Sequence, residues 1–305
     1  MSIALLLLGL LLAAVGGERF VRGAVGLATW LRIPAGVVGA TVAAFATSSP
    51  ELTVGVVSAL DNRSELALGD ATGSNMVNLG VVLGFTLLFG SLRVQRREVQ
   101  REIIGFIAAL AVLLVSSIDG RIAQTESISM IAIFVLWLTW VVRDAKKSRQ
   151  AVHDLAETRR GLILVELVLG LVLLMVSGRL IVVAAKDIGE VLGWSPFIMG
   201  SIVVAIGTSA PELVTTIVSA RRGHVGVGIG TVLGSNIFNS MLIVGTAGWI
   251  SPIEISVLPT LIAALISFAA TLAVIPSKSG ELGRKSGLVL TLLYVFFVSA
   301  LLIAQ

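Results

Sequence analysis

The sequence predicts an all-α polytopic membrane protein with ten transmembrane helices, arranged as two inverted five-helix repeats with both termini outside the cytoplasm. The composition, the distribution of basic residues and an internal repeat predict this fold. Of 305 residues, 56% are hydrophobic and 13% are charged, and the mean hydropathy is +1.01. Apolar runs recur along the whole chain, which is typical of a multi-pass membrane protein. The absence of cysteine excludes disulfides, thiol catalysis and cysteine-bound metals.

Apolar runs of about 18 residues or more mark the expected membrane spans. Ten occur, at residues 2–29, 35–60, 66–90, 100–118, 125–143, 160–188, 195–220, 225–249, 254–275 and 286–304. The first run could also be a cleaved signal peptide. We favour a span, because no Lys or Arg precedes Arg19, whereas a signal peptide begins with a basic segment.

Lysine and arginine are distributed unevenly between the loops that join these runs. Alternate loops hold sixteen of them: Arg32, Arg93, Arg96, Arg97, Arg101, Arg143, Lys146, Lys147, Arg149, Arg159, Arg160, Arg221, Arg222, Lys278, Arg284 and Lys285. The loops of the other side hold Arg63, Arg121 and Lys186. Because cytoplasmic loops are enriched in Lys and Arg, both termini are expected outside. The net charge of +4 therefore reflects topology in a cell membrane, and we expect no nucleic-acid partner.

One constant offset of 161 residues relates two parts of the chain. It converts ATSSPEL at 46–52 into GTSAPEL at 207–213, and GSNMVN at 73–78 into GSNIFN at 234–239. We therefore predict a first repeat at 1–143, a short cytoplasmic linker at 144–159 and a second repeat at 160–305. Since each repeat has five spans, an odd number, the second repeat enters the membrane from the opposite side, and a two-fold axis in the membrane plane relates the halves.

Each repeat places a carboxylate, Glu51 or Glu212, inside an apolar span. An ionised carboxylate there costs a few kcal/mol or more unless it faces a cavity or a cation. A protonated glutamate that only packs helices is the alternative, and its occurrence in both halves argues against it. Pro50 and Pro211 lack an N–H, so we expect them to open the helix and to free the carbonyls of the residues four positions earlier, Ala46 and Gly207.

Hydroxyl and amide side chains accompany the two carboxylates. They are Thr47, Ser48, Thr208 and Ser209 beside the glutamates, and Ser74, Asn78, Ser235 and Asn239 in the second motif. In each second motif the serine and the second asparagine are four residues apart and share a helix face. Gly73 and Gly234 leave room for a second helix to approach. Such an all-oxygen set suits a hard cation such as Ca²⁺ and lacks the imidazole or thiolate that transition metals prefer.

These motifs resemble the α-1 and α-2 repeats of the cation/calcium exchanger superfamily, especially its prokaryotic sodium/calcium exchangers. The resemblance extends over essentially the whole chain. It implies an antiporter and not an enzyme, exchanging Ca²⁺ for Na⁺ by alternating access, functional as a monomer and without a cofactor. The first and sixth spans would form a gating pair that slides against the other eight helices.

The resemblance also implies roles for individual residues. Glu51 and Glu212 would be the main Ca²⁺ ligands and would take part in Na⁺ sites. Further oxygens would come from the side chains of Thr47, Thr208, Ser48, Ser209, Ser74 and Ser235 and from the carbonyls of Ala44 and Ala205.

The chain departs from the resemblance at two positions. Many sodium/calcium exchangers have Asp where this chain has Asn239, so the expected core carries two carboxylates, which would balance one Ca²⁺ or two Na⁺. Stoichiometry and K⁺ transport are left open, and an electroneutral cycle is conceivable. Conversely, Asp70 lies one turn before Ser74, and its repeat mate is Thr231. Our hypothesis is that Asp70 supplies a carboxylate on the external side of the pathway; the alternative is a solvated residue at a helix end.

Other functions fit the sequence less well. A Ca²⁺/H⁺ antiporter of the same fold remains the main alternative, but that branch typically reads G-N-A-x-E around the glutamate, and here both halves keep hydroxyl-rich motifs. An intramembrane aspartyl protease needs a second aspartate that Asp70 lacks within the spans. A simple channel does not explain paired charged sites in inverted repeats.

Some further polar and aromatic residues have simpler interpretations. We expect a helix-packing or interfacial role for Glu166, and solvated side chains for His153 and His224 in cytoplasmic loops. Trp137 and Tyr294 are expected, like Trp140, at the membrane interface or against lipid.

Overall fold

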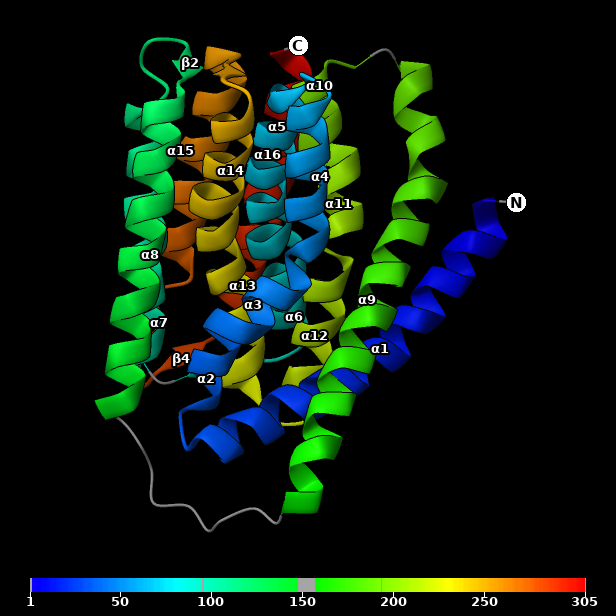
Figure 1. Ribbon diagram of the computed structural model, residues 1–305, viewed down its shortest axis with the longest axis vertical. Helices are drawn as coiled ribbons and strands as arrows, with labels where there is room; N and C mark the ends of the chain where they lie inside the picture. The colour runs from blue at the N-terminus through cyan, green and yellow to red at the C-terminus, as the bar shows by residue number, and fades with distance from the viewer. Residues whose placement is uncertain (1, 95, 148–156, 193, 305) are drawn as a thin grey trace.

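The computed structural model describes residues 2–94, 96–147, 157–192 and 194–304. Its helices form one bundle that runs along the long axis in Figure 1, with short strand pairs near the two ends. All ten expected spans are helical within the described residues. Most of the predicted linker, including His153, lies outside them.

Six of the described spans are single helices. They are α1 (Ser2–Leu31), α7 (Arg96–Val115), α8 (Gln124–Lys147), α9 (Glu157–Leu192), α15 (Val257–Ala273) and α16 (Arg284–Ile303). Their sequences are long apolar runs without an internal proline, except for Pro259 in the first turn of α15, where a missing N–H costs no hydrogen bond.

The other four spans are series of short helical segments, and each contains a π-helical turn. The second and third spans comprise α2 (Ala35–Val38), η1 (Gly39–Ala43), α3 (Ala44–Thr47) and α4 (Ser49–Leu60), then α5 (Ser64–Met76), η2 (Val77–Leu83) and α6 (Gly84–Phe89). Their repeat mates comprise α10 (Pro196–Met199), η3 (Gly200–Val204), α11 (Ala205–Thr208) and α12 (Ala210–Arg221), then α13 (Val225–Ile237), η4 (Phe238–Ile243) and α14 (Val244–Ile250). The π-turns, which are frequent at functional sites, fall at equivalent positions of the two repeats. In each repeat one precedes the first motif by two residues and the other overlaps the end of the second motif.

Two antiparallel strand pairs join the repeats and reveal their inversion. β1 (Leu92–Arg93) pairs with β4 (Glu281–Leu282), and β2 (Arg121–Ile122) pairs with β3 (Ile253–Glu254). The 161-residue offset relates β1 to β3. β1 lies beside its partner β4 near one end of the bundle, whereas β3 lies beside its partner β2 near the other end (Figure 1). Equivalent segments therefore face opposite sides of the membrane, as two inverted repeats require.

Small residues let the two repeats interlock at the centre. A Cβ added to Gly73 of α5 would lie 2.2 Å from the carbonyl oxygen of Ser201 in η3, and one added to Gly234 of α13 would lie 2.5 Å from that of Ala40 in η1. Ser201 and Ala40 are themselves related by the offset. The close approach expected at both glycines is therefore present, and each is made with the opposite repeat.

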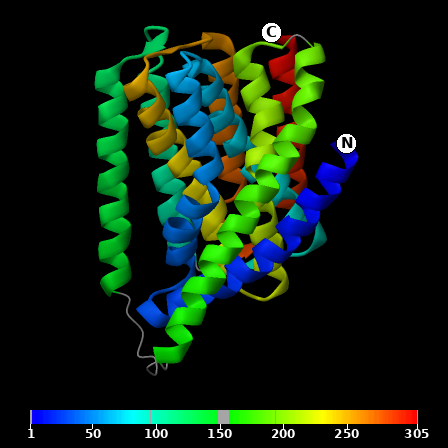
Figure 2. The ribbon, with the colours of Figure 1, turned by 45° about the vertical axis from the view of Figure 1, so that its right-hand side comes forward.

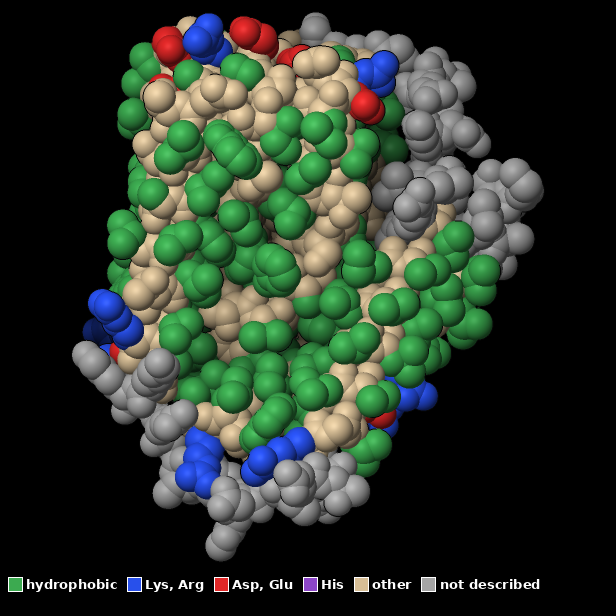
Figure 3. Space-filling model, in the orientation of Figure 1, with side chains coloured by type: hydrophobic (Ala, Val, Ile, Leu, Met, Phe, Trp, Pro, Cys, Tyr) green, Lys and Arg blue, Asp and Glu red, His purple; other side chains and the backbone are tan. Residues whose placement is uncertain are grey.

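The first and sixth spans lie side by side on one flank of the bundle. α1 and α9 cross it obliquely in Figures 1 and 2 and pack along one another. The face in Figure 3 is a broad apolar surface whose Lys, Arg, Asp and Glu side chains gather mainly toward its two ends. That distribution matches a hydrocarbon layer between two aqueous phases.

Hydropathy alone identifies fewer spans than the fold contains. Five described helices are long and apolar enough to cross a membrane, or six if the bent pair Pro196–Thr208 and Ala210–Arg221 counts as one.

The expectation for Trp137 was wrong: its side chain is buried beside Phe134 and against Gly105, because α8 packs this face inward. Trp140 is exposed, as expected for a lipid or interfacial contact.

Candidate cation site

Two helices break at mid-height of the bundle, each at a serine two residues before a proline. α3 ends at Thr47, Ser48 leaves helical geometry with φ −82° and ψ 9°, and α4 begins with Pro50 in its first turn. The second break, at Ser209, bends its helix pair by 42°. From the breaks α4 and α12 run to opposite ends of the bundle (Figure 1). Glu51 and Glu212 lie in the first turns of these half-helices, where the helix dipole favours negative charge.

The prediction of free carbonyls at the two prolines was wrong. Backbone N–H groups at the helix caps donate to the carbonyls of Ala46 and Gly207, so the break compensates for the hydrogen bonds that the prolines remove. The carbonyls of Ala44 and Ala205 each accept the N–H of the residue four positions on, Ser48 or Ser209. The hydroxyls of Thr47 and Thr208 approach the same two carbonyls at 3.4 Å, so both carbonyls already have donors within the chain.

Both glutamates are completely buried, but their surroundings differ. Oε1 of Glu212 accepts the Ser48 hydroxyl at 3.2 Å and the Ser235 hydroxyl at 3.0 Å, while its Oε2 has no hydrogen-bond partner. Neither oxygen of Glu51 has one. A buried carboxylate without partners is strongly destabilising. A bound cation would supply the missing partner at both groups.

The second motif joins the repeats through asparagines. Asn75 Nδ2 donates to Ser240 Oγ at 2.7 Å, and Asn78 Nδ2 donates to Asn236 Oδ1 at 3.0 Å. Neither side-chain polar atom of Asn239 has a hydrogen-bond partner, nor does Oδ1 of Asn78. Asn78 and Asn239 thus bring unpaired amide oxygens into the buried centre, whereas Asn75 and Asn236 lock α5 to the second repeat.

Asp70 belongs to the same buried region. Its side chain is 0% exposed, and its Oδ1 accepts the Thr208 hydroxyl at 3.1 Å. The alternative of a solvated residue at a helix end is therefore wrong, because α5 is buried continuously from Ala67 to Met76.

The remaining predicted residues lie around these carboxylates. Thr47 donates to the carbonyl of Ala43 at 3.0 Å, Ser74 and Thr208 share a hydrogen bond of 3.3 Å, and Ser209 Oγ has no partner. Glu166 lies apart, in an ion pair with Arg19 between α9 and α1 at 3.4 Å. That contact agrees with the expected helix-packing role.

A cation bound at this site would need oxygen ligands of several chemical types. Among the described residues, no three Asp, Glu, His or Cys side chains group closely enough to hold one metal ion by themselves. The site therefore combines carboxylate, hydroxyl, amide and carbonyl oxygens, a mixture that Ca²⁺ and Na⁺ accept more readily than transition metals do.

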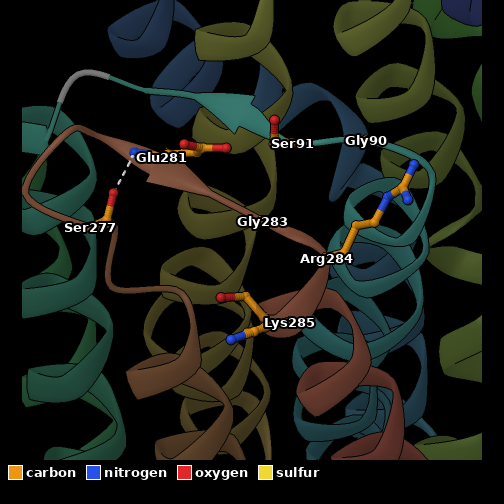
Figure 4. A pocket seen from close by; sticks show the side chains of 8 residues that line it. Gly90, Ser91, Ser277, Glu281, Gly283, Arg284 and Lys285 are labelled. Carbon is orange, nitrogen blue, oxygen red and sulfur yellow. Dashed lines mark hydrogen bonds between the residues drawn. The ribbon is translucent and has the colours of Figure 1, made fainter.

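An open pocket of about 580 Å³ lies elsewhere, beside β4, with Arg284 and Lys285 in its wall (Figure 4). Glu51, Glu212 and Asp70 do not line this pocket.

Three polar residues near the site were missed by reading the sequence. Ser240 anchors Asn75, and the hydroxyls of Thr215 and Ser219 are buried without a hydrogen-bond partner. Thr215 and Ser219 follow Glu212 at three and seven residues, a helical spacing that could have indicated a polar face on α12.

Buried carboxylates at broken helices in inverted repeats first define a class of protein: the chain is a multi-pass membrane transporter, not an enzyme. A family model described as sodium/calcium exchanger protein matches residues 1–143 and 162–303. The chain belongs to this family.

Individual relatives cover most of the chain. The inner membrane protein YrbG of Escherichia coli is 34% identical over 269 residues, with 84% of this chain and 82% of YrbG covered. The sodium/calcium exchanger MaX1 of Methanosarcina acetivorans is 24% identical and covers 97% of both chains. A solved structure of the sodium-calcium exchanger NCX_Mj, soaked with Na⁺ and Sr²⁺, matches with a TM-score of 0.83 and 26% identity, covering 98% of this chain and 97% of NCX_Mj.

Proposed function

We propose that this protein is a secondary antiporter that exchanges Ca²⁺ for Na⁺ across the membrane by alternating access. The observation that carries the proposal is the pair Glu51 and Glu212, completely buried at two symmetry-related helix breaks with three of their four carboxylate oxygens lacking a hydrogen-bond partner. These oxygens could replace the hydration shell of a bound cation. Two different cations would compete for them, as antiport requires.

The neutral oxygens favour Na⁺ over a proton as the driving ion. A proton needs only the carboxylates, whereas Na⁺ needs several further oxygens around it. Both repeats supply them through the hydroxyls at positions 47, 48, 74, 208, 209 and 235 and the carbonyls of Ala44 and Ala205. The relatives support this choice, since MaX1 is named a sodium/calcium exchanger and NCX_Mj structures were obtained with Na⁺ and with Ca²⁺ or Sr²⁺.

Alternating access would use the flank formed by α1 and α9. Both lie outside the cluster of α4, α5, α12 and α13 that holds the carboxylates, and α1 contacts α12. Movement of this pair against the cluster would open the site to one side at a time without disturbing the asparagine contacts between α5 and the second repeat.

The test is uptake of radiolabelled Ca²⁺ into proteoliposomes under an imposed Na⁺ gradient, compared with a pH gradient alone, each with and without K⁺. We expect uptake that requires the outward Na⁺ gradient. Uptake that ignores Na⁺ and follows the pH gradient would instead establish the Ca²⁺/H⁺ antiporter, and a requirement for K⁺ would add that ion to the cycle.

Neutralising either glutamate tests the location of the site. Glu51→Gln and Glu212→Gln should each reduce Na⁺-dependent uptake by about 100-fold or more, because a lost carboxylate removes a charge-assisted ligand worth several kcal/mol in a buried site. Glu254→Gln is the matched control, since Glu254 is exposed in β3 at the outer end. Near-normal uptake by either buried variant would contradict the site assignment.

A further inference from the structure

The two repeats do not use their equivalent hydroxyls in the same way. In one direction the pattern is regular: Ser48 and Ser235 both donate to Glu212. The 161-residue offset turns these donors into Ser209 and Ser74, which should then serve Glu51. Instead, Ser209 Oγ has no partner and Ser74 bonds to Thr208. One feature of the first repeat explains why Ser74 bonds to Thr208 and not to Glu51.

That feature is Asp70, whose repeat mate is Thr231. Thr231 donates to the carbonyl of Val227 in its own helix, and Thr47 likewise donates within its own helix. Thr208, the repeat mate of Thr47, has the carbonyls of its own helix within reach at 3.2 and 3.4 Å and, unlike Thr47, also contacts a carboxylate, Asp70, at 3.1 Å. Asp in place of Thr at one position thus gives a hydroxyl of the opposite repeat a charged acceptor.

The direction of these hydrogen bonds follows from the number of protons. An ionised carboxylate only accepts, so the single proton of Thr208 goes to Asp70 Oδ1. The Ser74 hydroxyl must then donate to Thr208. Both hydroxyl oxygens keep a lone pair, and Asp70 Oδ2 has no hydrogen-bond partner although it is buried. Within the described residues, no ion pair includes Asp70, Glu51 or Glu212.

We propose that Asp70 is a third carboxylate ligand of the transport site: its Oδ2, together with the oxygens of Thr208 and Ser74, holds a monovalent cation in a subsite on the external side of the Glu51 and Glu212 pair. The proposal rests on the antiport proposed above. Asp70 follows the outer end of α5 by six residues, about 9 Å, and Ser74 lies about 6 Å deeper.

The cation class follows from the ligands and their grouping. Among the described residues the three carboxylates do not group around one ion, and we assign Asp70 an ion of its own. One carboxylate with neutral hydroxyl oxygens offers less charge than Ca²⁺ sites usually have, and suits Na⁺. With three carboxylates, three Na⁺ would balance the site, whereas one Ca²⁺ leaves one negative charge uncompensated. Each exchange of three Na⁺ for one Ca²⁺ would then move one net charge across the membrane. In this proposal the third carboxylate, Asp70, is the reason for that net charge.

The experiment compares wild type with Asp70→Asn and Asp70→Thr, the residue of the other repeat, in proteoliposomes with a K⁺-diffusion potential set by valinomycin. For wild type, a change of roughly 100 mV should change the Ca²⁺ accumulation ratio at equilibrium by about 50-fold for each net charge moved. In both variants the ratio should become insensitive to voltage. Asp70→Glu, which keeps the charge, should retain the sensitivity, and Asp119→Asn in the exposed outer loop is the control.

Binding supplies a second readout that needs no transport. Radiolabelled Na⁺ bound at saturation to the purified, detergent-solubilised protein should fall by about one ion per molecule in Asp70→Asn, with elution on gel filtration unchanged. Unchanged Na⁺ binding and unchanged voltage sensitivity in Asp70→Asn would overturn the proposal. Wild-type uptake that ignores Na⁺ would overturn the antiport proposal instead, and bound Na⁺ would still decide the role of Asp70.

Discussion

Glu51 and Glu212 occupy equivalent positions in the two repeats but differ in how their charge is met. Two serine hydroxyls partly stabilise Glu212 without any ion, whereas Glu51 has no hydrogen-bond partner at all. Because an uncompensated buried charge depends most on a counter-ion, removal of the proposed cation should destabilise the surroundings of Glu51 more than those of Glu212. The symmetry of the fold thus does not extend to the energetics of the two carboxylates.

The residues that let the site form are as specific as those that fill it. Gly73→Ala should lower the free energy of unfolding by about 1–3 kcal/mol, because the added methyl group would lie against the backbone of Ser201 and overpack the centre. Thermal unfolding in detergent measures this change. Gly161→Ala in α9 is the control: nothing lies near that position, so Ala should be neutral or slightly stabilising. Equal melting temperatures for the two variants would contradict the packing described here.

At the scale of elements, α1 is bound both to its neighbour α9 and to the carboxylate-bearing cluster. Arg19 pairs with Glu166 of α9, and Glu18 pairs with Arg222 at the end of α12. Both contacts involve partly exposed side chains, so neither contributes much to stability. The two contacts differ in what they connect. One joins α1 to α9, which would move with it in alternating access, and the other joins α1 to α12, which would stay fixed.

Cross-linking distinguishes those two bodies, and the chain has no cysteine to interfere. A short thiol cross-linker between Arg19→Cys and Glu166→Cys should leave most Na⁺-dependent Ca²⁺ uptake intact, because α1 and α9 would move together. The same reagent between Glu18→Cys and Arg222→Cys should reduce uptake by about 10-fold or more, because it ties α1 to the fixed cluster. Uncross-linked samples of each double variant provide the baseline. The reverse order of effects would exclude α1 and α9 as the moving pair.

The whole molecule combines inversion with internal interlocking. Equivalent strand pairs lie at opposite ends, while Gly73 and Gly234 each receive the backbone of the opposite repeat. Neither repeat can therefore complete the site alone, since Glu212 takes one of its hydroxyls from each half.

Topology can be tested on intact cells with single cysteines. A membrane-impermeant maleimide should label Asp119→Cys beside β2 without permeabilisation, and Ser279→Cys beside β4 only after it. The reason is that the two exposed positions lie at opposite ends of the bundle, and the basic loops place the β4 end in the cytoplasm. Labelling of both in intact cells would contradict this orientation.

Much of this architecture was predictable from the chain because its signals are one-dimensional. Span positions follow from apolar runs, orientation from lysine and arginine counts, and inversion from an odd number of spans per repeat. Residues such as Glu51 and Glu212 could be selected because a carboxylate inside an apolar run is costly wherever the run folds. The repeat boundaries and ligand roles stay predictions.

Other features depended on where helices meet in space. The sequence by itself determined the membrane class, the inverted repeats and the paired glutamates, since these rest on local composition and spacing. Only the tertiary structure decided that Asp70 is enclosed and bonded to Thr208, that the carbonyls of Ala46 and Gly207 find cap donors, and that Trp137 faces inward. The contact of Asp70 with Thr208 joins residues 138 positions apart, which spacing along the chain does not reveal. The cap bonds are local, but they depend on the backbone geometry of the breaks at Ser48 and Ser209, which residue types alone do not specify.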